Sequence, residues 1–536
     1  MTATSIKLTH MTFEYEGTWN PIFKDVNLHL DTSWKLGLIG RNGRGKTTLL
    51  NLFSGHLQPT SGTIDMPVET ESFPFTCDLE GKTGLEYCLD AAGPFRKLDA
   101  TIQELIQRSD PASMEAYGKC LEAYEALDGY NIESKLQREV QMMGMDPDLL
   151  YRPAIHLSGG ERTKLQIIAL FLKPSRFLLI DEPTNHLDLE GRTELALYLR
   201  KKTGFILVSH DQAFVDTCCD HVLSINKKQI SLTKGNFSTW EENKLQTEKS
   251  ELAKKEQLQK EMKRLEKAAK NTRNWSGAIE KSKIGSGGDK GFIGAEAARM
   301  MKRALQIEVR RQKQMDEVDS FLQEFEAIKK LEFRQNVIKA PAYMKLYDIA
   351  YGYGDQALAQ KLNITIEPGD RIWVRGKNGS GKSTLMNLLA GDLQAQVGQV
   401  WQHTDVRIAR AWQDMPWTSG SVAEYVEAMG CDETGFIRML AYFDMDLEFI
   451  NRQIETLSEG ERKKLDIARA FSSNWELYLW DEPLNYMDYN FRVQLEQAIL
   501  KYQPTLVFVE HDQRFSEKVA TKILNLDDGT FIKVNA

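Results

Sequence analysis

Short runs of apolar residues, separated by polar segments, recur along both halves of the chain. Four of these runs immediately precede a glycine-rich or acidic segment, at residues 36–39, 177–180, 372–374 and 477–480. An apolar run of this length, without alternating polar positions, is typical of a strand buried on both faces of a parallel sheet. The chain holds no run of eighteen apolar residues. The pattern predicts an α/β protein without a membrane-spanning helix.

The segment from Glu241 to Glu332 has a different pattern. Apolar residues recur there at spacings of three and four, at positions 258, 262, 265 and 269 and again at 315, 318, 322 and 325. Such seams predict two long helices that pair as an antiparallel hairpin. Between them, residues 275–294 are rich in glycine, which disfavours a continuous helix. We therefore predict a hairpin whose tip lies at about 272–295.

Charge is distributed unevenly between this hairpin and the rest of the chain. The 536 residues carry a formal net charge of −8, whereas residues 254–311 contain sixteen Lys and Arg against seven Asp and Glu. A basic projection on an acidic body is expected to bind a polyanion. Aromatic and basic residues together suit RNA, where rings stack on bases and cations meet phosphates. The tip residues of this kind are Trp275, Lys281, Lys283, Lys290 and Phe292. The alternative is a solvated coiled-coil spacer.

The chain contains an internal repeat. The strand-like sequence at residues 6–15 is repeated in similar form at residues 344–353. Each copy is followed by a phosphate-binding loop of the pattern GxxxxGK[ST]. The glycines let main-chain N–H groups surround a phosphate, the lysine reaches the outer phosphates, and the next hydroxyl is a ligand for Mg²⁺. Two such loops predict two nucleotide-binding sites. Their residues are Gly40, Asn42, Gly43, Gly45, Lys46, Thr47 and Thr48, and Gly376, Asn378, Gly379, Gly381, Lys382, Ser383 and Thr384.

Two carboxylates stand at the end of a later apolar strand in each repeat. The pairs are Asp181–Glu182 and Asp481–Glu482. Nucleotides bind at the carboxyl ends of the strands in such sheets. We expect each aspartate to hold Mg²⁺ and each glutamate to orient and polarise the attacking water. A histidine follows the next strand in both repeats, His210 and His511, where a donor to the transferred phosphoryl group is needed.

With LSGGE at 157–161 and LSEGE at 457–461, this set of motifs resembles the ABC ATPases, in which LSGGE is the signature loop and the histidine is the switch residue. The resemblance implies that the halves pair head to tail, with each ATP held between the phosphate loop of one half and the signature of the other. The residues that this pairing unites are Lys46 with Ser458 and Gly460, and Lys382 with Ser158 and Gly160.

The same resemblance implies that Tyr15 and Tyr353 stack on adenine and that Gln413 is the glutamine of the Q-loop, a further Mg²⁺ ligand. The first half has Phe75 where this glutamine is expected. Further departures of the second half from the first are Glu459 for Gly159, Leu484 for Thr184, Tyr486 for His186 and Glu510 for Ser209. The two sites are chemically unequal, and we expect them to hydrolyse ATP at different rates.

The two repeats also differ in length. The phosphate loops lie 336 residues apart and the signatures 300, so the first half has 36 additional residues between these motifs. We predict a small helical arm at about 95–127, the alternative being a slightly enlarged helical subdomain. The expected domains are a first nucleotide-binding domain at 1–240, a helical linker at 241–332 and a second nucleotide-binding domain at 333–536.

Two nucleotide-binding domains, a charged helical linker and an arm resemble the ABC-F proteins, which act on ribosomes, over essentially the whole chain. The linker tip, the motif DEPLNYMD and the pair Glu510–His511 are most similar to antibiotic-resistance members of the Lsa and Vga type. The implied fold is two tandem ABC-type α/β domains joined by an antiparallel helical hairpin. The implied cofactors are ATP and Mg²⁺.

The ABC-F resemblance also implies a partner and an activity. The protein would bind the bacterial ribosome, its rRNA and tRNA, at the tRNA exit site in the ATP state, as a monomer without a membrane partner. The tip would reach toward the peptidyl-transferase centre and relieve inhibition by lincosamides, pleuromutilins and streptogramin A compounds. A housekeeping translation or ribosome-assembly factor is the alternative, and the ATPase subunit of an exporter is a third possibility.

The cysteines and the first residues bear on the compartment. Six Cys without CxxC spacing read as reduced thiols, and the first ten residues lack an apolar signal core. Both features predict a cytoplasmic protein.

Overall fold

The computed structural model describes residues 4–17, 21–108, 110–173, 176–185, 187–226, 230–247, 331–332, 336–353, 356–413, 415–443 and 445–534, with scattered positions between 249 and 313. Side chains at 352–361 lie outside this description. The chain divides into two units, Met1–Phe237 with Ile328–Ala536, and Ser238–Ala327. Among the described residues, no helix is long and apolar enough to cross a membrane.

The first repeat alternates strands and helices. Its elements are β1 (Ser5–Phe13), β2 (Phe23–Asp31), β3 (Lys35–Gly40), α1 (Lys46–Phe53), β4 (Ser61–Asp65), β5 (Glu69–Phe73), α2 (Gly84–Ala92), α3 (Phe95–Ile106), α4 (Pro111–Ala126), η1 (Gly129–Asn131), α5 (Ile132–Met142), η2 (Pro147–Tyr151), η3 (Ala154–His156), α6 (Gly159–Leu172), β6 (Arg176–Asp181), α7 (Leu189–Arg200), β7 (Phe205–Val208), α8 (Gln212–Cys218), β8 (His221–Ile225) and β9 (Ile230–Lys234).

The second repeat follows the same order with fewer helices. Its elements are β10 (Met344–Tyr353), β11 (Gln356–Ile366), β12 (Arg371–Arg375), α11 (Lys382–Ala390), β13 (Val397–Gln402), β14 (Ile408–Ala411), α12 (Val422–Ala428), α13 (Glu433–Tyr442), η4 (Leu447–Asn451), η5 (Ile454–Thr456), α14 (Glu459–Ser472), β15 (Leu477–Asp481), α15 (Tyr489–Tyr502), β16 (Leu506–Val509), α16 (Gln513–Val519), β17 (Lys522–Asn525) and β18 (Thr530–Lys533).

Each repeat builds one six-stranded sheet and one three-stranded antiparallel sheet. The larger sheets have the orders β5-β6-β7-β3-β8-β9 and β14-β15-β16-β12-β17-β18, and only the last strand of each runs antiparallel. The smaller sheets have the orders β2-β1-β4 and β11-β10-β13. The predicted α/β class and the two-fold repeat are thereby confirmed.

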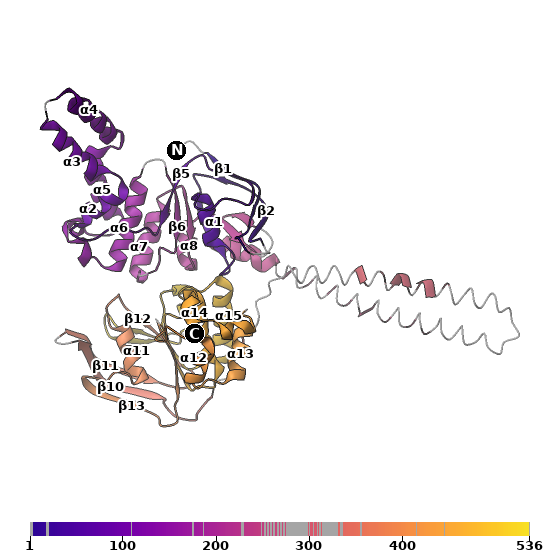
Figure 1. The fold of residues 1–536 in the computed structure, drawn as a ribbon. Helices are drawn as coiled ribbons and strands as arrows, with labels where there is room; N and C mark the ends of the chain where they lie inside the picture. The colour runs from indigo at the N-terminus through magenta and orange to yellow at the C-terminus, as the bar shows by residue number, and fades with distance from the viewer. Residues whose placement is uncertain are drawn as a thin grey trace. The chain divides into compact units, whose positions relative to one another are not determined.

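Strands β3, β6, β12 and β15 coincide with the apolar runs of the sequence. Each lies inside a six-stranded sheet, and all five residues of β15 are buried. Helices α1 and α6 pack on the six-stranded sheet of the first half (Figure 1). Because helices cover a mostly parallel sheet, its central strands have no polar face, which explains the uninterrupted apolar runs.

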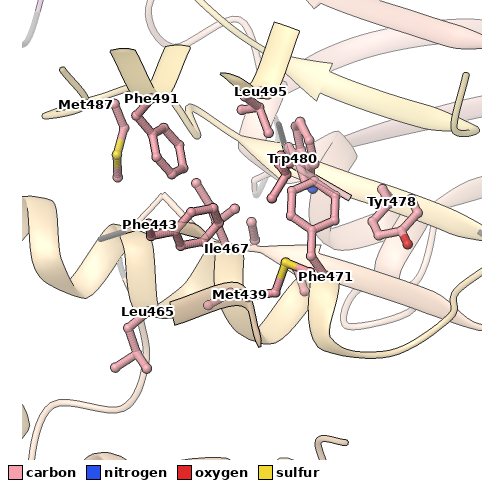
Figure 2. Close-up of a cluster of buried hydrophobic side chains, with 14 of the residues drawn as sticks. Met439, Phe443, Leu465, Ile467, Phe471, Tyr478, Trp480, Met487, Phe491 and Leu495 are labelled. Carbon is pink, nitrogen blue, oxygen red and sulfur yellow. The ribbon is translucent and has the colours of Figure 1, made fainter. Parts of the chain in front are cut away.

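The core of the second half fixes the strand that carries Asp481. Phe471 from α14 packs edge-on against Trp480 from β15, with ring centroids 5.3 Å apart. Figure 2 shows these rings among further apolar side chains from α13, α14, β15 and α15 and from residues next to these elements. They are Met439, Phe443, Leu465, Ile467, Tyr478, Met487, Phe491 and Leu495. Close packing of this kind leaves little freedom for α14 to shift along β15.

Helices α3 and α4 have no counterpart in the second half, where α12 is followed directly by α13. The two helices lie side by side (Figure 1). Only Phe95 in α3 and Ser113 in α4 are buried. These helices occupy the region where the length difference between the repeats predicts an arm.

Candidate nucleotide sites

The two phosphate-binding loops connect a central strand to a helix in both halves, β3 to α1 and β12 to α11. Four of their glycines, Gly43, Gly45, Gly379 and Gly381, have positive φ between 76° and 91°. Only glycine adopts this left-handed conformation at little cost, and a side chain at Gly45 would also collide with Ile22 and Phe23. The loops therefore have the tight backbone that directs N–H groups toward a phosphate.

The lysine of each loop is held by the carbonyls of its own loop. Lys46 Nζ donates to Gly40 O at 2.8 Å, and Lys382 Nζ donates to Gly376 O at 2.9 Å. Burial lowers the pKa of both lysines, opposed by nearby carboxylates. Both ammonium groups thus lie at the mouth of a helix N-terminus, where a phosphate is favoured.

Each loop hydroxyl meets the aspartate predicted to share its metal. Thr47 Oγ1 donates to Asp181 Oδ2 at 3.3 Å, and Ser383 forms a hydrogen bond with Asp481. Asp481 Oδ1 is buried without a hydrogen-bond partner. One carboxylate, one hydroxyl and substrate phosphates suit Mg²⁺, which keeps several waters and needs few protein ligands. The residues present therefore fit the ion, although the described part of the chain has no cluster of three His, Cys, Asp or Glu.

The two glutamates after these aspartates adopt strained backbones. Glu182 has φ 48° and Glu482 has φ 49°, a region that few residues other than glycine occupy. His210 Nε2 lies 3.4 Å from Glu182 Oε1, and His511 Nε2 lies 3.2 Å from Glu482 Oε1. His10 and Asp348 share such a conformation at equivalent bulges of β1 and β10, so it is the position of the glutamates beside the histidines and phosphate loops that points to a functional site.

The glutamates differ in their surroundings. Burial raises the pKa of Glu182 to about 8, and Asp181 adds to this. Burial also tends to raise the pKa of Glu482. The hydrogen bond and the charge of His511 outweigh this effect and lower the pKa to about 2. Asn485 Nδ2 donates to Glu482 Oε2 at 2.5 Å as well. The two sites are thus unequal in electrostatics as well as in sequence.

Both signature motifs begin a helix. Ser158 and Ser458 are the N-caps of α6 and α14, and each forms a capping box with the glutamate three residues on. The sequence LSGGE is therefore also a helix-start signal. In the first half the two glycines after Ser158 leave the first N–H groups of α6 accessible to an anion, whereas in the second half Glu459 follows Ser458.

Signature and phosphate loop of opposite halves line one cavity. A cavity of about 1140 Å³ is lined by Ser158 and Gly160 from the first half and by Lys382, Glu482 and His511 from the second. Its size accommodates a nucleotide. In the other site, Gly460 lies next to Asn42 of the first phosphate loop. One cavity therefore holds Lys382 with Ser158 and Gly160, and in the other site the contact that the structure shows is that of Asn42 with Gly460.

Two aspartates join the halves reciprocally. Asp188 caps α7 and accepts from Asn378 N at 3.3 Å, while Asp488 caps α15 and accepts from Asn42 N at 3.2 Å. The Asn42 side chain also donates to Tyr486 O at 2.7 Å. Sequence reasoning predicted Asn42 and Asn378 but missed Asp188 and Asp488 as site residues. Their repetition 300 residues apart, just after each carboxylate pair, is the signal that could have found them.

The structure describes the positions of some of the remaining predicted site residues and not of others. Tyr15 is 43% exposed, and its hydroxyl lies 3.1 Å from Thr48 Oγ1. Gln413 lines the cavity described above. Phe75 accepts a hydrogen bond through its carbonyl from Gln166, at 3.0 Å. The side chain of Tyr353 and the tip residues Trp275, Lys281, Lys283, Lys290 and Phe292 lie outside the described residues.

Comparison with known families finds one family model twice, once in each half of the chain. The family model described as "ABC transporter" matches residues 23–185 and 359–485, more than half of the chain. Each matched segment includes a phosphate loop, a signature and a carboxylate pair.

Similar proteins cover nearly the full length. ABC transporter F family member 5 of Arabidopsis thaliana is 25% identical over 98% of this chain and 75% of its own. The uncharacterized ABC transporter ATP-binding protein YfmM of Bacillus subtilis is 26% identical over 95% of this chain and 96% of its own. The probable ATP-binding protein YheS of Escherichia coli is 27% identical over 89% and 72%.

Solved structures with the same fold include an archaeal ribosome recycling factor, aABCE1, in complex with the ribosomal stalk protein aP1. It has a TM-score of 0.55 at 18% identity and covers 96% of this chain and 87% of its own. A model of ribosome-bound archaeal Pelota and ABCE1 contains a chain with a TM-score of 0.53 at 18% identity, covering 96% and 76%. At this identity the likeness concerns the fold.

Proposed function

The chain belongs to the ABC transporter family, as an ABC-F ATPase, and from this premise we propose that it acts on the bacterial ribosome. The observation that carries the ATP-dependent part of this proposal is the joint cavity, which is lined by the phosphate loop of one half and the signature of the other. Nucleotide bound there contacts both halves and stabilises their association.

The residues of each site have distinct roles in this proposal. Bound ATP supplies the phosphoanhydride that is hydrolysed. Phosphates are held by the loop N–H groups with Lys46 or Lys382, and Mg²⁺ by the loop hydroxyl with Asp181 or Asp481. Gln413 supplies a further Mg²⁺ ligand in the second site only. Each adenine stacks on a tyrosine, and these are Tyr15 and Tyr353.

Water activation belongs to the glutamates. Glu182 and Glu482 orient and polarise the attacking water, and His210 and His511 hydrogen-bond to the transferred phosphoryl group. The distances of 3.4 and 3.2 Å between each histidine and its glutamate support this pairing. Hydrolysis removes the contacts that the outer phosphate makes with the opposite signature, so the halves lose affinity for each other.

The charge of the linker supports the ribosome as the partner. Residues 254–311 are basic by nine charges on an acidic chain, and the span 275–292 contains aromatic residues among lysines. Such a segment suits a folded RNA. We place the protein at the tRNA exit site in its ATP state, as a cytoplasmic monomer, with the tip directed toward the peptidyl-transferase centre.

Protection from large-subunit antibiotics is the narrower form of the proposal. It is supported by the similarity of the tip, of DEPLNYMD and of Glu510–His511 to resistance proteins of the Lsa and Vga type. A housekeeping translation or assembly factor is the second candidate.

The central test is the double variant Glu182→Gln, Glu482→Gln. Glutamine keeps the shape of the side chain but loses the charge that polarises water, so ATP binding should persist while turnover falls by about a hundred-fold or more. In ATP, the variant should sediment with bacterial ribosomes to a greater extent than the wild type. Glu80→Gln with Glu427→Gln, two exposed glutamates, is the matched control. Equal sedimentation of both variants would contradict the ribosome cycle.

The two candidate functions separate in a growth test. Deleting residues 282–290 shortens the tip, and the expected result is loss of growth on a lincosamide or pleuromutilin with ATP turnover intact. The host is drug-sensitive and carries the wild-type chain as its reference. Failure of the wild-type chain to protect the host would favour the housekeeping factor.

A further inference from the structure

Lys463 is a buried lysine inside the second half that the proposed mechanism does not use. It lies on α14, and only 6% of its surface is exposed. It lines the same cavity as Lys382, Gln413 and Glu482. A buried ammonium is costly unless its donors are satisfied, so its partners determine its role.

All three partners of this ammonium are main-chain carbonyls. Lys463 Nζ donates to Trp412 O at 2.5 Å, to Gln413 O at 3.2 Å and to Asp481 O at 3.1 Å. An ammonium has three N–H groups, so its donor capacity is fully used. The lysine thereby ties the loop after β14 to the end of β15. These two places carry the glutamine and the aspartate assigned to Mg²⁺.

The next turn of α14 holds the same loop from its other side. Asp466 Oδ2 accepts from Trp412 N at 2.9 Å, and its other oxygen accepts from Arg469 Nε at 3.0 Å. The Arg469 guanidinium also lies over the Trp412 ring, 4.5 Å from its centroid. Both main-chain groups of Trp412 are therefore bound to α14, which the core in Figure 2 fixes against β15.

The first half lacks this arrangement. It has Thr163 where the second half has Lys463, and Gln166 where the second half has Asp466. Gln166 Nε2 donates to Phe75 O at 3.0 Å. A threonine side chain carries no charge and is too short to bridge the loop and β6. The lysine thus occurs in the half that has the Q-loop glutamine, and the threonine in the half that has Phe75.

We propose that Lys463 is a positioning residue of the second nucleotide site: it holds the Gln413 loop at a fixed distance from Asp481, so that both are placed for one Mg²⁺ ion. This role rests on the proposed assignment of the two nucleotide sites. Outer residues that orient metal ligands affect metal affinity by about 10- to 100-fold. The first site, which has Phe75 in place of the glutamine, has no use for such a tether.

The test uses the full chain and a fluorescent, non-hydrolysable ATP analogue titrated with Mg²⁺. Lys46→Ala leaves only the second site competent, and Lys382→Ala leaves only the first. Lys463→Met keeps the aliphatic stem and removes the ammonium. In the Lys46→Ala background it should raise the half-saturating Mg²⁺ concentration about ten-fold, while analogue binding in EDTA stays the same. In the Lys382→Ala background the Mg²⁺ dependence should not change.

The second background also tests for simple damage to the helix. Helix α14 begins at the signature serine Ser458, which belongs to the first site, so a distorted helix would weaken analogue binding there as well. Lys501→Met, at an exposed position of α15, controls for the loss of a positive charge and should change neither background.

Two results would overturn the role of Lys463. One is an unchanged Mg²⁺ dependence in the Lys46→Ala background, and the other is an equal change in both backgrounds. If the analogue binds normally in both parents, such a result leaves the proposed function standing. If it binds in neither parent, the nucleotide sites themselves are misassigned and both proposals fall.

Discussion

At the residue scale, the two halves differ in the hydrogen bond between the segment after the carboxylate pair and the residue before the histidine. Thr184 and Ser209 face each other in the first half with their hydroxyl oxygens 3.2 Å apart. The second half has Leu484 and Glu510 at these positions, and Glu510 Oε1 accepts from Leu484 N at 2.6 Å. The carboxylate reaches the main chain because leucine has no hydroxyl to offer. The two substitutions therefore compensate each other.

This carboxylate has a consequence for stability. Burial raises the pKa of Glu510 to about 7, from 4.5 in the unfolded chain. Between these values the folded state binds more protons than the unfolded state, so this residue makes the wild type less stable as pH rises through that window. Glutamine does not titrate. Relative to the wild type, the free energy of unfolding of Glu510→Gln should therefore increase between pH 5 and pH 8, by up to about 3 kcal/mol. Its melting temperature relative to that of the wild type should rise over the same range.

Differential scanning calorimetry at several pH values measures this difference. Glu517→Gln, at an exposed position of α16, is the control for exchanging a glutamate for a glutamine. Parallel melting curves for Glu510→Gln and the wild type across the window would contradict the assigned pKa.

At the element scale, the helix caps link folding to the sites. Ser421 caps α12 and Ser458 caps α14, and both form capping boxes with a glutamate. Only the second of these helices points its first turn toward a phosphate loop, since Gly460 lies next to Asn42. The same local motif is thus structural in one helix and part of a proposed nucleotide site in the other.

Two serine-to-alanine variants separate these roles. Ser421→Ala and Ser458→Ala should each lower the free energy of unfolding by about 1 kcal/mol, because each removes an N-cap. Only Ser458→Ala should also weaken ATP analogue binding in the Lys382→Ala background, where the first site alone is competent. Calorimetry and fluorescence titration measure the two effects. Equal loss of binding in both variants would mean that the cap acts through stability alone.

At the scale of the whole molecule, the arm is nearly independent of the nucleotide-binding core. Helices α3 and α4 bury two residues between them, whereas α2 and α5 both pack on α6. Helix α6 carries the signature of the second site. The arm can therefore be removed without disturbing the elements that form the sites.

The corresponding variant replaces residues 97–126 by a short Gly-Ser linker. The free energy of unfolding of the remaining chain should change by less than about 1 kcal/mol, since loop length has a weak effect and little apolar surface is lost. ATP turnover without ribosomes should be unchanged. Calorimetry and a phosphate-release assay measure both. Loss of basal turnover would show that the arm supports the nucleotide sites.

Much of this organisation followed from the sequence alone. The phosphate loops, carboxylate pairs and signatures are contiguous motifs, and their chemistry depends on short-range spacing that any reader of the chain can find. The parallel strands were equally visible, because burial on both faces leaves an uninterrupted apolar run. The repeat then fixed the equivalence of the two halves and the place of the additional residues between Phe75 and Leu157.

Only the tertiary structure decided how distant residues meet. The hydrogen bonds of Asp188 to Asn378 and of Lys463 to the Gln413 and Asp481 carbonyls join positions 190, 50 and 18 residues apart. The inequality of Glu182 and Glu482 likewise depends on burial and on the placement of His511, which no local pattern encodes. A motif specifies which groups are present, but distance and solvent exposure, which set their energies, arise only when the chain folds.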